Sequence, residues 1–536
     1  MRCLSTVLAL RRYLNLVRLS SLPSNAAPEA PTAPRIGFVP TMGCLHAGHL
    51  SLIERARAEN DYLIVSLFVN PTQFSPQEDL DRYPRDLVAD QALCEKAGVD
   101  VLFLPSADEL YGQGGQQPGL SPQFTQVIPP ESLLTGLCAQ VRPTHFQGVA
   151  TIVVKLLNLI QPDRAYFGQK DAQQLAIIRR VVADLNLGTA IIPCPIVREA
   201  SGLALSSRNR YLSPTEQRQA TVLSRALFAA QDAFAAGQYD RQSLVSSARN
   251  ILETEPEVKF EYLDLVDPDT LAPLEKVEIK GMLAVAAQVG SARLIDNVVL
   301  KARQPIIAID GPAGAGKSTV TQRVAKTLDL LYLDTGAMYR AVTWFVLNAK
   351  VALTDELAIA DLVAQCQIRF EFPKGEAFTP TRVWINDREV TEAIRGSEVT
   401  AHVSNIAAQS AVRECLVKEQ QRYGQHGGLV AEGRDTGTTV FPDAELKIFL
   451  TASPGERARR RQQDMQNLGQ PCRSLEELES EIKRRDRLDS SRAISPLVQA
   501  PDALYLETDR LTIAEVTAKI VTLYHERIKT AIRTVP

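Results

Sequence analysis

Two glycine-containing segments constrain the fold of this 536-residue chain more than any other feature. The first, Met42–His49, directly follows the apolar run at residues 35–40. The second, Gly311–Ser318, directly follows Ile306–Asp310 and satisfies the pattern G-x-x-x-x-G-K-S/T. A strand before such a segment and a helix after it bring free backbone N–H groups and the positive end of a helix dipole together, which favours phosphate binding. The sequence therefore predicts two α/β units, each with its own site for a nucleotide phosphate.

Length and composition place the chain among ordinary multidomain enzymes. At 536 residues the chain exceeds what one hydrophobic core supports, and its 45% apolar and 23% charged content is typical of soluble globular proteins. The net charge of −3 argues against a strongly basic nucleic-acid-binding surface, and no apolar run reaches the ~18 residues that span a bilayer. The eight cysteines form no C-x-x-C pair, which suits a reducing compartment. We expect a cytoplasmic protein without a nucleic-acid or membrane partner.

The first 34 residues leave two interpretations open. Residues 1–20 contain four arginines and no acid, which is compatible with a targeting peptide or with an amphipathic first helix of the first domain. We favour the helix, because Arg11 and Arg12 interrupt the apolar run and no A-x-A cleavage site follows. Residues 21–34 contain four prolines and predict an extended linker.

Apolar runs alternate with helical patterns between residues 35 and 187, which predicts a parallel sheet covered by helices on both faces. The expected strands are 36–40, 62–69, 99–104 and 164–167, and the expected helices are 49–58, 87–96, 148–159 and 172–185. Residues 191–302 predict a smaller subdomain with one long polar helix after Ser213 and strands at 260–266, 282–289 and 292–297.

A second α/β unit is expected from residue 303 to residue 536, after a joint at 301–305. Its first strand is Ile306–Asp310, and its later strands are expected at 428–431, 446–450 and 504–506. An insertion spans roughly 367–390, and a highly charged helical stretch spans about 456–492. The two phosphate motifs differ in kind and no internal repeat is present, so the sequence indicates a fusion of two units.

The first motif contains residues suited to holding a nucleotide. Gly43 and Gly48 allow a close backbone approach, while His46 and His49 lie three residues apart and can face one phosphate group from a helical turn. Protonated or hydrogen-bonding imidazoles there would stabilise charge on the phosphate oxygens. The alternative is a pair of ordinary surface histidines, because H-x-G-H is a short pattern.

Further segments distinguish these alternatives, because together they match one family over nearly all of residues 1–300. They lie at 40–43, 68–74, 83–85, 142–146, 167–174 and 202–209. This half resembles the pantothenate synthetases (pantoate–β-alanine ligases), a group of H-x-G-H nucleotidyltransferases with a Rossmann-like fold and a small C-terminal subdomain. The resemblance implies that ATP activates pantoate as a pantoyl-adenylate, which the amine of β-alanine then attacks, releasing AMP and pyrophosphate. It also implies a homodimer formed through this half.

The resemblance implies a role for particular residues. Gln73 and Gln174 match the positions that hold pantoate, and their amides offer both a donor and an acceptor. Without the resemblance, we would assign both to solvated polar surface. His49 matches a proton donor, and Asp171 could help to hold Mg²⁺. The implied ATP contacts, of which His46, His49, Lys170 and Arg208 are expected to be catalytic, are Met42, Gly43, His46, Gly48, His49, Gly168, Lys170, Asp171, Val197, Leu205, Ser206, Ser207 and Arg208. Gln169 and Gln147 depart from the family, which commonly has Glu and Arg there.

The second motif predicts nucleotide binding but leaves the reaction open. Its backbone amides would cradle phosphates, Lys317 would reach the β- and γ-phosphates, and Ser318 could bind Mg²⁺. A switch-type GTPase would use the same loop, but the chain has no N/T-K-x-D motif for reading guanine. The H-R-D and D-F-G motifs of protein kinases are also absent.

The rest of this half resembles the bacterial cytidylate kinases, which are P-loop nucleoside monophosphate kinases. The matching segments are 333–340, 432–438, 441–444 and 482–492. The implied ATP contacts are Gly311, Gly314, Gly316, Lys317 (also catalytic), Ser318 and Thr319. The implied CMP contacts are Asp334, Thr335, Arg340, Ser404, Arg413, Arg434, Asp435, Arg485, Asp489 and Arg492.

The chemistry of these residues fits such a reaction. Arginines can neutralise the charge of the phosphates that the two nucleotides bring, and an acid, an arginine and a hydroxyl can read cytosine. The stretch at 456–492 could close as a lid that excludes water, although most of its charges fit a solvated helix equally well.

The sequence thus predicts a bifunctional enzyme that makes pantothenate and phosphorylates CMP or dCMP, with ATP and Mg²⁺ needed by both halves. Two alternatives remain. One is a non-catalytic nucleotide-sensing scaffold built from decayed enzyme domains, against which the intact phosphate and acceptor positions argue. The other keeps the kinase but makes UMP or dCMP its main acceptor.

Overall fold

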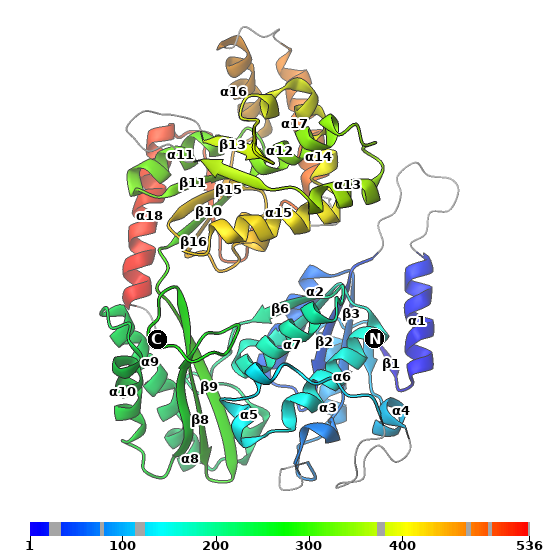
Figure 1. Cartoon of the computed structure of the whole chain (residues 1–536), viewed down its shortest axis with the longest axis vertical. Coiled ribbons are helices and arrows are strands. Elements are labelled where there is room, and N and C mark those ends of the chain that lie inside the picture. The colour runs from blue at the N-terminus through cyan, green and yellow to red at the C-terminus, as the bar shows by residue number, and fades with distance from the viewer. Residues whose placement is uncertain are drawn as a thin grey trace. The chain divides into compact units, whose positions relative to one another are not determined.

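The computed structural model shows two α/β units, so the predicted fold class is confirmed. The chain divides into the compact units Met1–Ala302 (unit 1) and Arg303–Val535 (unit 2) (Figure 1). Among the described residues, no helix is both long and apolar enough to cross a membrane. The structure describes residues 1–20, 34–75, 80–112, 124–371, 381–467, 473–490 and 496–533.

Unit 1 contains a six-stranded parallel sheet in the order β1-β4-β3-β2-β5-β6. Its central strands are almost continuously buried, as expected for a parallel sheet covered on both faces. The four strands expected here all form. The sheet consists of β1 (Arg2–Leu4), β2 (Ile36–Thr41), β3 (Tyr62–Leu67), β4 (Val101–Phe103), β5 (Arg164–Gly168) and β6 (Ala190–Cys194).

Helices cover both faces of this sheet. One buried cluster joins α1, α6 and α7 to one face, and a second joins α2 and α3 to the other (Figure 1). All four expected helices are confirmed. The helices around the sheet are α1 (Val7–Ser20), α2 (Ala47–Glu59), α3 (Leu87–Lys96), α4 (Ala107–Tyr111), α5 (Cys138–Val141), α6 (His145–Ile160) and α7 (Ala172–Asp184).

The first residues of the chain form part of this unit. Helix α1 buries Leu10 and Leu14 in the core, and the Arg18 guanidinium donates to the carbonyls of Ile160 and Gln161 at the end of α6. The interpretation of an amphipathic first helix is therefore confirmed. Strand β1 was not expected, because three residues show no periodicity, and it forms by parallel pairing with β4. The expected linker falls mostly at residues 21–33, outside the described residues.

The strand order has a switch point between β2 and β5, because β3 and β4 follow on one side of β2, whereas β5 and β6 lie on the other. Ligands of such sheets bind beyond the carboxyl ends of the strands at this point. Strand β6 pairs in parallel with β5, so the expected subdomain boundary after residue 190 is wrong: the first sheet continues to Cys194.

The smaller part of unit 1 is an antiparallel sheet in the order β7-β8-β9, packed against helices (Figure 1). The three strands are confirmed, but the single long polar helix is wrong. A capping box of Ser213 and Glu216 starts α8 as expected, but the helical stretch divides at Thr221, and α9 buries Leu223 and Leu227. The elements are α8 (Pro214–Ala220), α9 (Val222–Ala235), α10 (Arg241–Leu252), β7 (Lys259–Val266), β8 (Lys280–Val289) and β9 (Ala292–Lys301).

Unit 2 contains a five-stranded parallel sheet in the order β11-β15-β10-β16-β17, with β10 at its centre. The expected strands form, and β11 adds one that was not expected. The elements of the sheet and its flanking helices are β10 (Ile306–Asp310), α11 (Lys317–Leu328), β11 (Leu331–Asp334), α12 (Thr335–Asn348), α13 (Glu356–Ala364), α14 (Ser397–Ile406), α15 (Ser410–Tyr423), β15 (Leu429–Gly433), β16 (Leu446–Thr451), β17 (Leu504–Glu507) and α18 (Ile513–Arg533).

Two further parts of unit 2 correspond to the expected insertion and charged stretch. The insertion forms a small antiparallel sheet of β12 (Ile368–Glu371), β13 (Arg382–Ile385) and β14 (Arg388–Glu389). The charged stretch forms α16 (Pro454–Asn467) and α17 (Leu475–Ser490), which share a small apolar core.

Two leucines of α1 test whether this segment stabilises unit 1. Leu10 is 0% exposed and Leu8 is 72% exposed. Leu10→Ala should lower the free energy of unfolding of unit 1 by about 2–5 kcal/mol, because it removes buried methyl groups and leaves a cavity. Leu8→Ala should change it by less than about 0.5 kcal/mol. Hydrogen-exchange mass spectrometry of α6 peptides over a urea series measures the free energy of unfolding of unit 1 in both variants.

Tryptophan fluorescence provides the control, because both tryptophans of the chain, Trp344 and Trp384, lie in unit 2. Their urea transition should be unchanged in either variant. Equal effects of the two substitutions on α6 would show that α1 does not contribute to the core of unit 1.

Two candidate active sites

The first site lies at the carboxyl end of β2, next to the switch point of the unit 1 sheet. The backbone turns sharply there, with positive φ angles at Gly43 (85°) and Cys44 (54°). The carboxylate of Asp90, which is 3% exposed, accepts the N–H groups of Cys44 and Leu45 at 2.8 and 2.7 Å. Sequence reasoning missed Asp90, which carried no signal beyond being an acid on a half-apolar helix. It anchors the loop that follows Met42 and leads into α2.

The two histidines form a reciprocal cap at the start of α2. The Nδ1 atom of His46 accepts the N–H of Gly48 at 3.1 Å, and the Nδ1 atom of His49 accepts the N–H of His46 at 3.4 Å. The two ring centroids are 4.1 Å apart. Because both Nδ1 atoms are acceptors, the proton of each neutral imidazole is on Nε2. Each ring therefore has one N–H left to donate to a ligand.

Both imidazoles are held in the neutral form. Burial lowers the pKa of His46 to about 4, assisted by the charges of Lys170 and Arg210 and opposed by Asp171. Burial lowers the pKa of His49 to about 3, assisted by His46 and Lys170. The sequence left open whether these rings act as protonated cations or as neutral hydrogen-bond donors. Their environment favours neutral hydrogen-bond donors at neutral pH.

Gly48 leaves the space that the ring of His46 occupies. A Cβ atom at residue 48 would lie 2.9 Å from Cε1 and 3.0 Å from Nδ1 of His46, so any larger residue would displace the ring. The same Cβ atom would lie 3.8 Å from the side chain of Leu205. The first motif and the loop around Leu205 therefore meet at this point.

A cavity of about 500 Å³ opens between the parallel sheet and the β7-β8-β9 part of unit 1. The residues expected to contact ATP or pantoate that line it are Lys170, Asp171, Gln174, Ser206 and Arg208. Lys170 also acts electrostatically on both histidines, so the cavity and the α2 cap share one electrostatic environment. Gly168 ends β5 directly before this turn.

Two buried polar residues of β9 hold the segments that carry these side chains. The Nδ2 atom of Asn297 donates to the carbonyls of Gln169 and Lys170, both at 3.0 Å. Asp296 accepts two hydrogen bonds from the guanidinium of Arg198, at 2.6 and 2.9 Å. Sequence reasoning missed both, although two polar residues in an apolar strand pattern are a recognisable signal.

Arg198 belongs to the loop that carries the remaining ATP positions. Leu205 N–H donates to the Val197 carbonyl at 3.0 Å, and the hydroxyl of Ser206 accepts the Arg208 N–H at 3.3 Å. Ser207 is buried within the same turn. The structure therefore brings the loops at residues 42–49, 168–171 and 197–208 together.

The two glutamines expected to hold pantoate have different surroundings. Gln174 lines the cavity, whereas Gln73 is buried, and its Oε1 accepts a hydrogen bond from Asn70 at 3.0 Å. The Gln73 carbonyl also accepts from Arg142 at 3.2 Å and lies 2.8 Å from the Nδ1 atom of His145, and both of these residues line the cavity. Gln73 thus lies one contact away from the cavity wall.

Gln147 and Gln169, the two departures from the family pattern, have different contacts. Gln147 donates to the side chain of Gln126, while the main chain of Gln169 is held by Asn297.

The second site lies at the carboxyl end of β10, where three glycines shape the phosphate loop. The φ angles are 149° at Gly311, 78° at Gly314 and 86° at Gly316. A Cβ atom on Gly311 would lie 1.9 Å from the carbonyl oxygen of Leu450, so this position requires glycine. Gly316 directly precedes α11, whose first N–H groups face the loop.

The loop lysine is turned back onto its own loop. The Nζ atom of Lys317 donates to the carbonyls of Gly311 and Pro312 at 2.8 and 2.9 Å. Burial lowers its pKa to about 8, with Arg434 adding to the effect and Glu432 opposing it. A bound phosphate would add further negative charge beside this ammonium group and favour its charged form.

Glu432, at the end of β15, connects the loop to the neighbouring strand. Its two carboxylate oxygens accept from the hydroxyls of Ser318 and Tyr332, both at 2.7 Å. Its segment is part of the resemblance to the cytidylate kinases, which implied no role for Glu432 itself. An acid that ends a buried strand beside the phosphate loop was the available signal.

A cavity of about 1260 Å³ runs from the phosphate loop across the carboxyl ends of β11 and β15. Arg492 and Gly311 are the expected contacts not found in its lining: Arg492 lies outside the described residues, and Gly311 lies at the base of the loop. The expected contacts that line it are Gly314, Gly316, Lys317, Ser318, Thr319, Asp334, Thr335, Arg340, Ser404, Arg413, Arg434, Asp435, Arg485 and Asp489.

Several charged side chains line this cavity. Arg413 pairs with Asp435, and its guanidinium lies 5.3 Å from the centroid of the Tyr339 ring. Arg434 pairs with Asp489 at 2.6 Å. Burial and the charge of Arg434 lower the pKa of Arg485 to about 10. The Nε atom of Arg485 is buried and has no hydrogen-bond partner among the described residues, as expected of a cation that awaits an anionic ligand.

The positions nearest to the strands are polar, with Thr335 buried and Asp334 and Arg340 half-buried. The Thr335 hydroxyl donates to the Glu432 carbonyl at 2.7 Å, and Arg340 donates to the Thr400 hydroxyl at 3.0 Å. Asp334 accepts the N–H of Ala337 at the start of α12, and burial, with Glu432 beside it, raises its pKa.

Comparison with known proteins identifies both halves. A profile of the family described as pantoate-beta-alanine ligase matches residues 15–299, and one described as cytidylate kinase matches residues 307–526. A solved pantothenate synthetase from Thermus thermophilus is 45% identical, covers 56% of this chain and 99% of its own, and has a TM-score of 0.49.

Relatives that carry both halves in one chain match almost end to end. A protein from Trichormus variabilis named bifunctional pantoate ligase/cytidylate kinase is 58% identical over 98% of this chain and 99% of its own. A protein of the same name from Acaryochloris marina is 56% identical over 97% of this chain and 98% of its own. This chain therefore belongs to the family of bifunctional pantoate ligase/cytidylate kinases.

Proposed function

We propose that unit 1 condenses pantoate with β-alanine at the expense of ATP, and that unit 2 transfers the γ-phosphoryl group of ATP to CMP or dCMP. The observation that supports this proposal is that each of two compact units contains a strand–loop–helix segment with the groups needed to bind phosphate. One is built on the paired imidazoles at the start of α2, and the other on the glycine loop before α11.

In unit 1, a pantoate carboxylate oxygen attacks the α-phosphorus of ATP, and the bond to the bridging oxygen breaks to release pyrophosphate. The Nε2–H groups of His46 and His49 are the donors that stabilise charge on the phosphate oxygens. Lys170 and Arg208 supply positive charge from the cavity wall. The amine of β-alanine then attacks the acyl carbon, loses a proton, and displaces AMP. No side-chain nucleophile is required, so positioning supplies much of the rate.

In unit 2, an oxygen of the CMP phosphate attacks the γ-phosphorus of ATP while the bond to the β-phosphate breaks and ADP leaves. Lys317 turns from its own loop to the transferred phosphate, and Arg340, Arg434 and Arg485 neutralise charge from the acceptor side. The buried and unpartnered Nε of Arg485 supports this role.

The acceptor base is proposed to be cytosine because the cavity wall offers a carboxylate that can accept a hydrogen bond from its amino group. Asp435 is 5% exposed and lines the cavity beside Arg413 and Ser404. Cytosine presents an exocyclic amino donor, whereas uracil presents a carbonyl oxygen that a carboxylate would repel. This arrangement favours CMP and dCMP over UMP.

Both reactions are proposed to use Mg²⁺. In unit 2, the Ser318 hydroxyl and the Glu432 carboxylate are neighbouring oxygen donors of the kind that Mg²⁺ prefers, with nucleotide phosphates as the remaining ligands. In unit 1, Asp171 is the candidate ligand. When bound, the ion would neutralise phosphate charge. The residues described by the structure contain no group of three or more His, Cys, Asp or Glu side chains arranged as a metal site, so the protein alone is not expected to hold the ion.

The location and assembly of the chain remain proposals. The seven cysteines described by the structure are all free, which supports a reducing compartment such as the cytoplasm. A homodimer through unit 1 is proposed from the family resemblance alone.

Two substitutions test whether the sites act independently. His49→Ala should reduce AMP release from ATP, pantoate and β-alanine by at least about 100-fold, because it removes a preorganised donor, and it should leave ADP release with CMP unchanged. Lys317→Met should reduce ADP release with CMP and leave AMP release from ATP, pantoate and β-alanine unchanged. Absence of both activities from the unsubstituted chain would favour the non-catalytic scaffold.

The protonation state of the histidines gives a pH prediction. Both pKa values lie far below the ordinary 6.5, so His46 and His49 should remain neutral, with the proton on Nε2, from pH 8 down to pH 5.5. The chain has six histidines, so ¹⁵N NMR of histidine-labelled protein can follow the individual rings, with His49→Gln for assignment. Protonation of either ring with a midpoint above pH 6 would contradict the prediction.

Asn297, which also lines the cavity, should position the Lys170 turn through its hydrogen bonds to the carbonyls of Gln169 and Lys170. Asn297→Ala removes two buried hydrogen bonds, so kcat/KM for pantothenate formation should fall about 10- to 100-fold through displacement of Lys170. The matched control is Asn250→Ala, at an exposed position on α10. This substitution should change kcat/KM for pantothenate formation less than twofold. Kinase activity in the same preparations reports the amount of active protein. Equal ligase activity in the two variants would exclude the positioning role.

A further inference from the structure

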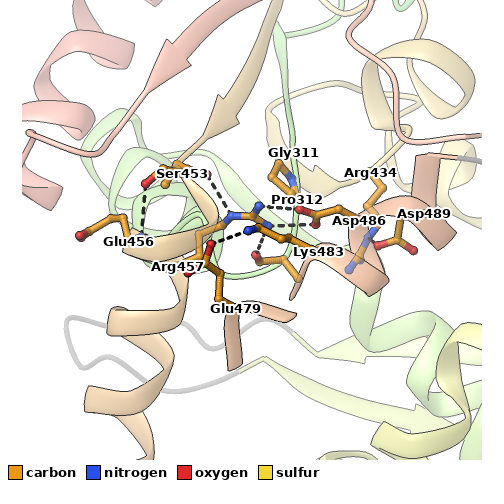
Figure 2. A network of polar contacts seen from close by, with 12 residues as sticks. Gly311, Pro312, Arg434, Ser453, Glu456, Arg457, Glu479, Lys483, Asp486 and Asp489 are labelled. Atoms are coloured by element: carbon orange, nitrogen blue, oxygen red, sulfur yellow. Dashed lines mark hydrogen bonds and ion pairs between the residues drawn. The ribbon is translucent and has the colours of Figure 1, made fainter. Parts of the chain in front are cut away.

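Arg457 connects three segments of unit 2 through one buried guanidinium group. The residue is 3% exposed and lies in the first turn of α16. Its Nε donates to the Ala452 carbonyl at 2.9 Å, just beyond the end of β16. Its Nη1 donates to the carbonyl of Ala313 in the phosphate loop at 3.1 Å, and Nη1 and Nη2 together form a two-point pair with the carboxylate of Asp486 on α17. Figure 2 shows this network.

The phosphate loop packs directly against this arginine. A Cβ atom added to Gly314 would lie 3.4 Å from the Cβ of Arg457, so the start of α16 forms one wall of the loop. The Ala313 carbonyl that Arg457 holds is the one before Gly314 in the loop. The guanidinium therefore holds the loop at the carbonyl next to the two, of Gly311 and Pro312, that the ammonium group of Lys317 holds.

Asp486 lies between two α17 residues that line the nucleotide cavity, although it does not itself belong to the lining. Arg485 directly precedes it, and Asp489 follows one helical turn later, where it pairs with Arg434 of the β15 segment. Both neighbours line the same cavity as the phosphate loop. Figure 2 shows Asp489 and Arg434 beside the Arg457–Asp486 pair. The position of Asp486 thus determines where its two neighbours lie relative to the loop.

We propose that Arg457 is a positioning residue for phosphoryl transfer. Through Asp486 it fixes the distance between the phosphate loop, which holds the donor, and Arg485, which faces the transferred group. This role rests on the proposed kinase activity of unit 2, and Arg457 itself touches no substrate.

Energetics support a geometric role for this pair. Arg457 is buried while Asp486 is half-buried, and an ion pair with a buried partner gains little stability over well-packed apolar residues, because the buried charge loses its hydration. Arginine is suited to this position, because its planar fork can bind a carboxylate at two points and still donate Nε to a third group. Lysine would retain the charge but could not reach Ala452, Ala313 and Asp486 at once. Arg457→Lys therefore separates geometry from charge.

The main experiment measures CMP phosphorylation by Arg457→Lys and by the nearly isosteric Asp486→Asn in the full chain. Each should lower kcat about 10- to 100-fold, because Arg485 is displaced from the reacting phosphate, while KM for ATP changes less than about threefold because the loop amides remain. The kcat of the double variant should lie within about twofold of the lower of the two single-variant kcat values, since both substitutions remove the same interaction. A structural role alone would not produce this separation of kcat from KM.

The same helix offers a matched control. Lys483 and Glu479 form an exposed ion pair one turn away from Asp486 on α17, with Lys483 56% exposed at its side chain (Figure 2). Lys483→Ala should leave kcat within twofold, as expected for an exposed pair. Pantothenate formation by unit 1 of each variant measures the concentration of folded chain, and Trp344 and Trp384 report the folding of unit 2.

Three results would overturn the positioning role: Arg457→Lys with a kcat within twofold of the unsubstituted chain, a kcat loss that matches the unfolded fraction of unit 2 by fluorescence, or an equal loss in Lys483→Ala. An unsubstituted chain that phosphorylates none of CMP, dCMP and UMP would instead overturn the proposed function of unit 2, and the positioning role with it.

Discussion

A buried carboxylate that satisfies backbone N–H groups fixes a site loop in each unit, and the rest of each site depends on it. In unit 1, Asp90 accepts the N–H groups of Cys44 and Leu45. In unit 2, Asp310 accepts those of Thr436 and Gly437 at 2.8 and 2.7 Å. Unpaired N–H groups in a buried loop would cost about as much as a lost hydrogen bond each. The carboxylates therefore allow these loops beside the two sites to be both buried and irregular.

The two sites also share a second level of organisation, in which a residue distant in sequence holds the segment that carries a cation. Asn297 holds the carbonyl of Lys170 from a strand more than a hundred residues later. Arg457 holds the phosphate loop of Lys317 from the start of α16. Neither residue is part of the recognisable motif. In both cases the motif supplies the chemical group, and the distant residue sets its position.

The local features of both sites could be predicted from the sequence because they follow from short-range patterns. Glycines that need positive φ, histidines three residues apart and a strand–loop–helix order all lie within ten residues. The alternation of apolar runs predicted the two parallel sheets for the same reason. The Rossmann-like strand order, by contrast, depends on pairing between distant segments, and the resemblance to a known family supplied it.

The elements and residues that the sequence did not predict also depend on contacts between distant segments. Strand β1 has three residues and exists only because β4 offers an unpaired edge, which periodicity cannot reveal. Strand β6 was not expected, and its residues fall in the predicted smaller subdomain because their parallel pairing with β5 is not visible in their composition. The break between α8 and α9 at Thr221 depends on the apolar side of α9 packing against β9. Asp90, Asn297 and Arg457 were missed because their partners lie far along the chain.

The inward turn of Lys317 has a consequence for the proton balance of nucleotide binding. Without a ligand its pKa is lowered to about 8, so in mildly alkaline buffer a share of the molecules carries a neutral amine there. Phosphate oxygens arriving beside that amine stabilise its charged form and raise the pKa again. Occupation of unit 2 therefore takes up protons from the buffer above neutral pH, and the heat of binding will vary with the ionisation enthalpy of the buffer chosen.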